Sequence, residues 1–377
     1  ATAPEVRGYS FLVYEVLRLP LAFLLVVEGG LGLHGALLAV IIAHAAMILL
    51  ACLSLYRRGL RLEGIDFNLI KRWFKGFSIP LIRAIQRLLT NADSVLLALF
   101  SGSEVPVAFM SASYSLRNPV IYGQTMASGL YAKMLVGGGG HDVEEVIRMY
   151  LAPTLFVMTT LICLSGPLMS LLNPIYQEAY WIVIITATFT FINVLISVVS
   201  PVVSGREDVD LKPTVTVKDY IRSTLFKWRV TGVVLQATSL IIGSSLVFVF
   251  YGDVILMASA YPIGWLIGHI VLLPRYYRMA KRVVNFKFPW RDTLAFIAAS
   301  ACSILCYLLL RTYALTVENF WVDLPPLLIH IAIAGVVYFI ISYALSPWLR
   351  SFLRTARRFM LTSIFKGENH SINSNNP

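Results

Sequence analysis

The sequence carries little charge for its length, and this excludes most classes of soluble protein. Only 14% of its 377 residues are Asp, Glu, Lys or Arg, whereas 58% are hydrophobic. The mean hydropathy is +0.74. A water-soluble domain carries about 25% charged residues, most of them on its surface. An ordinary cytosolic enzyme, a disordered protein and a fibrous repeat are therefore excluded.

Motifs for catalysis, metal binding and nucleotide binding are also missing. The sequence has no Gly-rich nucleotide loop, no His-Glu-x-x-His motif and no Ser-His-Asp arrangement outside the apolar runs. The few cysteines lie inside apolar runs without metal-ligand spacing, and we interpret them as reduced thiols. They are Cys52, Cys163, Cys302 and Cys306. We therefore expect no enzyme activity, no cofactor and no metal.

Long apolar runs dominate what is present. Runs of about 20 residues are long enough to cross the roughly 30 Å hydrocarbon core of a bilayer as helices. The sequence predicts an all-α fold, a polytopic transmembrane helix bundle with about ten transmembrane helices. The predicted spans are 11–28, 35–55, 77–100, 105–134, 149–172, 178–204, 231–251, 253–274, 292–313 and 323–345.

The basic residues predict the orientation of these spans. With the N-terminus inside, 26 of the 31 Lys and Arg residues fall on the inner side, and only Arg311 falls on the outer side. Cytoplasmic loops carry such an excess of Lys and Arg. We therefore expect a multi-pass protein of the cytoplasmic membrane with both termini in the cytoplasm. The net charge of +11 then indicates anionic membrane lipids as partners, and no nucleic acid.

Two inner segments have apolar residues interleaved with Lys and Arg. Segments 62–76 and 347–365 therefore predict amphipathic helices in the inner interface. Gly137–Gly140 predicts a hinge before a helix that starts near Asp142. The last residues are polar and predict a disordered tail.

The third predicted span has a polar face. At about 100° per residue, its polar residues lie within about 80° of Arg83. They are Gln86, Arg87, Thr90, Asn91, Ser94 and Ser101. Asp93 lies at the edge of this stripe. A charge at bilayer depth costs several kcal/mol unless it faces water, a partner or a ligand.

The fourth predicted span repeats the pattern around Arg117. Its polar residues lie within about 60° of that arginine. They are Ser113, Tyr114, Gln124, Ser128 and Tyr131. Since the short turn Ser101–Glu104 makes the two helices antiparallel neighbours, Arg87 and Arg117 should lie at similar depth and line one cavity. Arginine suits phosphate oxygens, so the cavity suits a lipid diphosphate. The alternative is that the arginines snorkel or pair with Asp93 and Glu104, and only position the helices.

Other polar residues inside the spans give weaker signals. Glu15 and Arg18 are three residues apart and are expected to neutralise each other, although Glu15 is also a candidate for ion coupling. His44, His269 and His330 are isolated, and we interpret them as packing residues.

Three segments carry a family resemblance. Residues 91–120, NADSVLLALFSGSEVPVAFMSASYSLRNPV, resemble the seventh and eighth helices of polysaccharide exporters and lipid-linked oligosaccharide flippases. This family belongs to the superfamily that also contains multidrug/toxin extruders and the lipid II flippase. Residues 166–185, GPLMSLLNPIYQEAYWIVII, are similar to its ninth-to-tenth turn, through Pro174, Tyr176 and Ala179. PVVSG at 201–205 is similar to the inner end of its tenth helix.

The resemblance implies a domain organisation over the last ten of fourteen helices. Residues 1–56 would be the last two helices of an N-terminal lobe, followed by a cytoplasmic amphipathic linker at 57–76. Residues 77–274 would form a C-terminal six-helix lobe with an unusually long cytoplasmic insert at 205–230. Two extra helices at 275–345 and a cytoplasmic amphipathic helix and tail at 346–377 would complete the chain. The missing first four helices agree with the absence of an initial Met.

The resemblance also implies a function. It implies alternating access, in which two lobes move a glycan linked to polyprenyl or dolichyl diphosphate across the membrane. Enzymes that assemble the glycan would be further partners. The diphosphate would meet Arg83, Arg87 and Arg117, and Asp93 would take part in ion coupling. The expected contacts to sugar hydroxyls are Gln86, Asn91, Ser113, Tyr114 and Gln124.

Three other functions stay open at this point. A cation-coupled multidrug extruder of the same superfamily needs carboxylates in the cavity. A membrane-embedded glycosyltransferase needs an acidic site in a sizeable aqueous loop, and no such cluster is visible. A non-transporting membrane scaffold is the third alternative.

Overall fold

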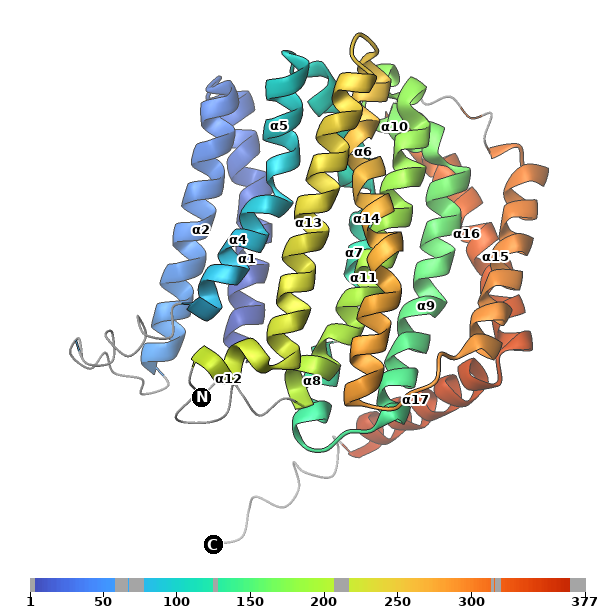
Figure 1. Ribbon diagram of the computed structural model, residues 1–377. Coiled ribbons are helices and arrows are strands. Elements are labelled where there is room, and N and C mark those ends of the chain that lie inside the picture. The colour runs from blue at the N-terminus through green and yellow to red at the C-terminus, as the bar shows by residue number, and fades with distance from the viewer. Residues whose placement is uncertain are drawn as a thin grey trace, which may run out of the picture. The chain divides into compact units, whose positions relative to one another are not determined.

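The computed structural model describes residues 4–57, 67, 78–124, 128–206, 217–312, 315 and 320–366. These described residues form helices joined by short connections, and no strand occurs among them (Figure 1). The chain divides into two compact units, residues 1–76 and 77–377.

The first unit is a pair of helices. Helix α1 (Pro4–Ala22) continues into one stretch of π-helix, η1 (Phe23–Glu28), and a tight turn leads to α2 (Gly32–Arg57). Glu15 and Arg18 form an ion pair of 3.4 Å on α1, as their spacing predicts. The predicted interface helix at 62–76 lies outside the described residues, apart from Phe67.

The second unit is built on long helices that run the length of the bundle. Seven helices of the described residues, α2 of the first unit among them, are long and apolar enough to cross a membrane. The six in the second unit are α9 (Gly140–Cys163), α11 (Tyr180–Arg206), α13 (Thr224–Val249), α14 (Val254–Val283), α15 (Trp290–Leu309) and α16 (Phe320–Leu345).

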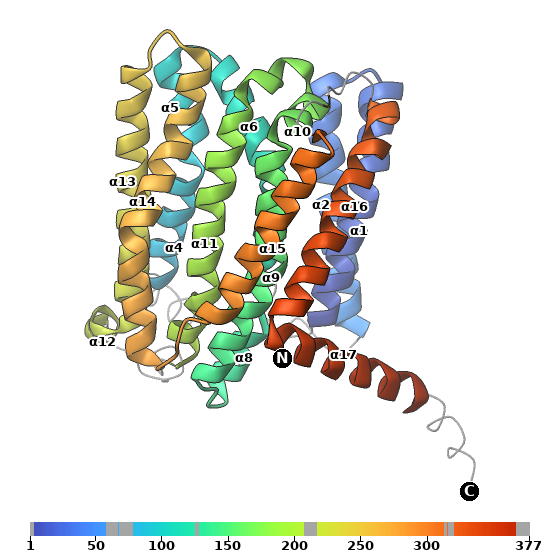
Figure 2. The ribbon, with the colours of Figure 1, turned by 90° about the vertical axis from the view of Figure 1, so that its right-hand side faces the viewer.

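The short helices of the second unit join or flank these long ones. Figures 1 and 2 show α12 near one end of this unit and the α5–α6 and α13–α14 connections at the other. We call these the α12 end and the turn end. The short helices are α4 (Ser78–Thr90), α5 (Ala92–Ser101), α6 (Val105–Leu116), α7 (Asn118–Tyr122), α8 (Ser128–Leu135), α10 (Ser165–Leu172), η3 (Pro174–Ala179) and α12 (Val217–Arg222).

The third predicted span is broken in the middle. It consists of α4 and α5, which are separated at Asn91, where the backbone leaves helical geometry with φ −101° and ψ 1°. The Asn91 amide donates to the carbonyl of Leu88, three residues back, instead of four residues back. This break shifts the phase of the helix. The predicted polar stripe, which assumes an uninterrupted helix, therefore does not continue on one face.

The fourth predicted span is broken at Arg117. Proline has no amide hydrogen, and its ring collides with the carbonyl four residues earlier. Pro119 therefore disrupts the helix at Ser115, and α6 gives way to the short α7 with Arg117 between them. A further break separates α7 from α8. Each of these pieces is shorter than a full crossing.

A hinge and a helix start appear where the sequence predicts them. Gly137 has a positive φ of 99°, and α9 begins three residues later. The amide of Gly139 donates to Asp142 Oδ2 at 2.9 Å, so Asp142 caps the helix start.

The last three helices of the second unit pack beside α9 and one another. Helices α15 and α16 pack against each other and against α9, and α17 (Pro347–Lys366) turns away from α16 (Figure 2). An ion pair joins Arg148 Nε on α9 to Asp292 Oδ2 on α15 at 2.9 Å. The Ser346 hydroxyl, at the corner before α17, donates to Asp292 Oδ1 at 2.6 Å. One buried carboxylate therefore ties three elements together.

Candidate functional site

A cavity of about 500 Å³ lies inside the second unit. Its walls come from α4, α5, α7, α8, α11, α13 and α14. The lining residues of α13 belong to its first half, and those of α14 run from Trp265, near its middle, to Tyr276. The cavity therefore occupies mainly the half of the unit nearest the α12 end. Small-molecule sites in proteins have volumes of about 300–1,000 Å³. The space is therefore large enough for a ligand or part of one.

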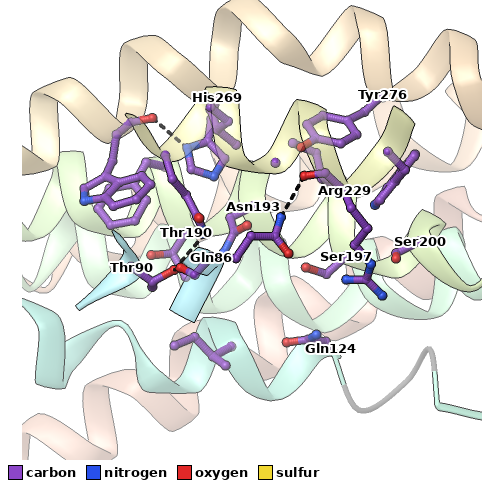
Figure 3. Close-up of a pocket in the computed structure, with 18 of the residues that line it drawn as sticks. Gln86, Thr90, Gln124, Thr190, Asn193, Ser197, Ser200, Arg229, His269 and Tyr276 are labelled. Atoms are coloured by element: carbon purple, nitrogen blue, oxygen red, sulfur yellow. Dashed lines mark hydrogen bonds between the residues drawn. The ribbon is translucent and has the colours of Figure 1, made fainter. Parts of the chain in front are cut away.

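Helix α11 contributes a polar stripe that the sequence analysis missed. Its members follow one another at spacings of three or four residues, which places them on one helix face. Figure 3 shows this row along one side of the cavity. The stripe consists of Thr190, Asn193, Ser197, Ser200 and Ser204. The spacing is visible in the sequence, but Ser and Thr in membrane helices also pack without a ligand, so the pattern alone did not stand out.

Asp93 lies at the deep end of the cavity and is 3% exposed. Its Oδ2 accepts hydrogen bonds from the hydroxyl of Tyr114 at 2.8 Å and from Trp265 Nε1 at 3.2 Å. Its Oδ1 accepts the amide of Ser94 at 2.8 Å. A buried carboxylate is tolerated when its oxygens are hydrogen-bonded in this way. Trp265, 172 positions away on α14, is a partner that the sequence did not indicate.

Arg117 lies between two aromatic rings. Its guanidinium carbon is 3.8 Å from the centroid of Tyr114 and 5.2 Å from that of Phe189. Both rings attract a cation through their π faces. Arg117 Nε is buried and has no hydrogen-bond partner among the described residues. The guanidinium is therefore held in position by ring contacts, and its Nε–H is a buried donor without a partner among the described residues.

The hairpin α5–α6 places these two charges at complementary helix ends. Asp93 is in the first turn of α5, and Arg117 caps the C-terminus of α6. A helix N-terminus stabilises an anion, and a C-terminus stabilises a cation. Gly102, with a φ of 64°, makes the tight turn between the two helices. The hairpin therefore holds opposite charges at similar depth, joined through Tyr114.

A second polar contact joins α4 to α13. Gln86 Nε2 donates to the carbonyl of Arg229 at 3.1 Å, and Gln236 Nε2 donates to the Thr90 hydroxyl at 2.7 Å (Figure 3). Gly232 makes this close approach possible, because an added Cβ would lie 2.2 Å from Gln86 Nε2. Gln236 Oε1 is buried without a hydrogen-bond partner among the described residues, so one acceptor in the wall is unsatisfied.

Arg229 and His269 complete the wall on the side of α13 and α14. The Arg229 side chain extends from α13 toward Ser197 and Ser200 on α11 (Figure 3). His269 is 3% exposed, and its Nδ1 lies 2.6 Å from the carbonyl of Trp265. His269 therefore has the satisfied packing contact that the sequence analysis expected, while one edge of it lines the cavity.

The predicted site residues separate into two groups. Gln86, Arg117, Gln124 and Asp93 line the cavity. Arg87 and Asn91 are exposed and do not line it, although Gln86 and Thr90 of the same segment do. The predicted common cavity therefore contains Arg117 without Arg87.

The remaining predicted residues lie elsewhere. Ser113 is fully buried and its hydroxyl contacts the Met110 carbonyl at 2.7 Å and the Thr186 hydroxyl at 3.2 Å, so it joins α6 to α11. Tyr114 lies behind the cavity wall, on Asp93. The Arg83 side chain lies outside the described part of the chain, and Glu15 belongs to the first unit.

The charges of the lining favour an anion. Among the described lining residues, Arg117 and Arg229 are positive and Asp93 is negative, and the two hydrogen bonds from Tyr114 and Trp265 already serve that carboxylate. The rest of the wall combines amides, hydroxyls and aromatic rings with apolar residues such as Ile121, Ile196 and Leu235. Within the described residues no group of three or more His, Cys, Asp or Glu could hold a metal ion. This wall can therefore bind a molecule that combines negative charge with hydroxyl groups.

Comparisons with known proteins support the fold. No protein-family description and no curated protein matches the sequence. A solved structure, "Lipid II flippase MurJ, inward closed conformation", has a similar fold, with a TM-score of 0.62 and 16% sequence identity over 90% of this chain and 67% of that chain. At this identity the likeness shows the fold alone. It confirms the all-α polytopic helix bundle.

Proposed function

We propose that this chain belongs to a membrane flippase that translocates a lipid-linked diphosphate glycan by alternating access. The observation that carries the proposal is Arg117, fixed between two rings in a polar cavity with a buried unpaired donor. Arginine binds phosphate oxygens through two parallel hydrogen bonds. The likeness to a lipid II flippase and the resemblance of residues 91–120 support the same function.

The two sides of the cavity suit the two parts of such a head group. In the proposal, Arg117 and Arg229 bind the diphosphate. The α11 stripe, with Gln86 and Gln124, offers the hydroxyl and amide groups that hydrogen-bond to sugars. For Arg83 and Arg87, contact with the diphosphate stays a prediction.

The proposal also includes the location and the mechanism. The basic residues favour a cytoplasmic membrane with both termini inside, which would make the α12 end cytoplasmic. The cavity would then receive the head group from the cytoplasm while the lipid tail stays in the bilayer. Asp93, engaged by Tyr114 and Trp265, is the proposed ion-coupling group.

A cation-coupled drug extruder is a second candidate, because Asp93 is a buried carboxylate beside aromatic rings. The two arginines in the same wall oppose it, since like charges repel an organic cation.

The experiment uses the purified chain in liposomes. A fluorescent polyprenyl-diphosphate disaccharide is supplied in one leaflet, and a membrane-impermeant quencher measures its appearance in the other. We expect translocation above that of empty liposomes, and no uptake of cationic dyes. Dye transport without lipid translocation would contradict the flippase function and favour the drug extruder. If correctly inserted protein shows neither activity, the remaining function is the non-transporting scaffold.

A further inference from the structure

A second hollow shares no lining residue with the polar cavity, and its wall is almost entirely apolar. This groove has a volume of about 450 Å³ and lies between α9, α16 and α17. Helix α9 contributes Met149, Ala152, Pro153, Phe156 and Val157. Helix α16 contributes Gly335, Tyr338, Phe339 and Ser342. Helix α17 contributes Trp348, Leu349, Phe352 and Leu353.

Small residues on facing helices explain why the groove is open. Ala152 on α9 and Gly335 on α16 leave space that larger side chains would fill, and a Cβ added at Gly335 would lie 3.2 Å from Phe156 Cζ. The Tyr338 hydroxyl donates to the Ala152 carbonyl and holds the two helices together beside the groove. From Gly335 to Ser342 the groove follows α16 for roughly 10 Å.

Helix α17 closes the lower end of the groove. It runs across the foot of α16 at an angle to the long helices (Figures 1 and 2). Leu349 is buried, and the Trp348 ring packs edge-on against Phe296. The Ser346 hydroxyl accepts the Leu349 amide at 3.2 Å and donates to Asp292, which fixes the corner between α16 and α17. The apolar face of α17 is therefore docked in place.

The other face of α17 is strongly basic. Helix α17 contains no Asp or Glu. Arg350 lies three residues before the groove residue Leu353, and Arg357 lies four residues after it, so both are its neighbours on the helix surface. Arg354 lies between these two arginines in the sequence. Within the described part of the chain, none of these three arginines has a carboxylate within 4 Å. The arginines do not line the groove, but they lie on the neighbouring face of the helix that closes it, without a carboxylate partner among the described residues.

We propose that this groove is a binding site for one resident anionic phospholipid, with an acyl chain along α9 and α16 and its phosphate at the arginines of α17. An acyl chain runs along the membrane normal, as the groove does, and a head group lies in the interface, where a basic amphipathic helix lies. The site is separate from the polar cavity, and it does not depend on the proposed transport function.

The charge of these three arginines favours a lipid over a second copy of the chain. In a symmetric pair, the arginines of one α17 would lie near those of the other, and like charges repel. An anionic head group has the complementary charge.

The test measures lipid retained by the purified chain. The chain is stripped of lipid in detergent and titrated with phosphatidylglycerol or with phosphatidylcholine of the same chain length, and bound lipid is counted by native mass spectrometry. Replacing all three arginines (R350Q, R354Q and R357Q) should weaken phosphatidylglycerol binding by roughly tenfold or more and leave phosphatidylcholine binding unchanged. The matched control removes three exposed cations near the end of α14 (R278Q, K281Q and R282Q) and should leave both unchanged.

Two further variants test the groove itself. Ala152→Leu and Gly335→Leu each place a larger side chain in the groove, from opposite walls, and each should abolish phosphatidylglycerol binding. The same loss in both variants would indicate that the filled groove, and not local misfolding at one position, excludes the lipid. Equal loss in the α14 control would show general surface attraction and overturn the proposal. Unchanged lipid binding with an altered oligomeric state in the filled variants would assign the groove to a second copy instead.

Discussion

Replacing Arg117 tests the candidate site most directly, because the structure separates this arginine from Arg87. The sequence alone gives the two equal weight. The structure places the Arg117 guanidinium in the cavity wall, against Tyr114 and Phe189, whereas Arg87 is exposed outside the cavity. We therefore expect Arg117→Gln to impair translocation severely and Arg87→Gln to impair it weakly.

The expected magnitudes follow from these surroundings. A charged hydrogen bond to a phosphate in a buried site contributes about 1.5–3 kcal/mol. Loss of about 3 kcal/mol corresponds to roughly a hundredfold lower transport rate. Arg117→Lys keeps the charge but loses the planar fork, so its rate should fall by roughly tenfold. An exposed charge contributes about 1 kcal/mol or less, so Arg87→Gln should lower the rate by roughly fivefold at most.

The assay is the initial rate of lipid-linked glycan translocation in liposomes that contain equal amounts of inserted protein. Protease accessibility of the purified liposomes shows that each variant is inserted as the wild type is. Wild-type transport by Arg117→Gln would refute the site. A fall of equal size in both glutamine variants would refute the separation of the two arginines.

Two more predictions address the packing that supports the site. Asp292→Ala removes a carboxylate that binds Arg148 and Ser346, so it should lower the free energy of unfolding by about 3–5 kcal/mol. Denaturation in mixed micelles measures this change. An unchanged denaturation midpoint would contradict the buried ion pair. Gly232→Leu displaces the Gln86 side chain into the cavity. It should lower the free energy of unfolding by about 1–3 kcal/mol and slow translocation. Gly166→Leu, at an open position, serves as its control and should have neither effect.

The sequence predicts the overall class and most helix positions well, because membrane crossing is set by length and hydropathy. The long helices α11, α13 and α14 coincide with apolar runs. Helix breaks are harder to predict from the same signal. Pro119 predicts one of them, because proline disrupts a helix, but Asn91 has no such property.

The candidate site is only partly visible in the sequence. Arg117 and Asp93 stand out because isolated charges in apolar runs are costly. Their partners do not stand out, since Trp265 and Phe189 are ordinary residues of a membrane helix until the fold brings them to the hairpin. The polar residues of the α11 stripe recur at helical spacing, and this spacing is visible in the sequence. Several other helices also carry hydroxyl groups on one face, and only the structure shows that the α11 face lines the cavity.

The one-sided position of the polar cavity has a consequence for leakage. Toward the turn end, the space between the same helices is filled by packed side chains that include Leu97, Met110, Val247 and Tyr261. About ten residues of helix, roughly 15 Å, separate the cavity from that end. A polar solute that enters the hollow half therefore meets packed, mostly apolar side chains before it reaches the turn end, which disfavours its passage through this unit.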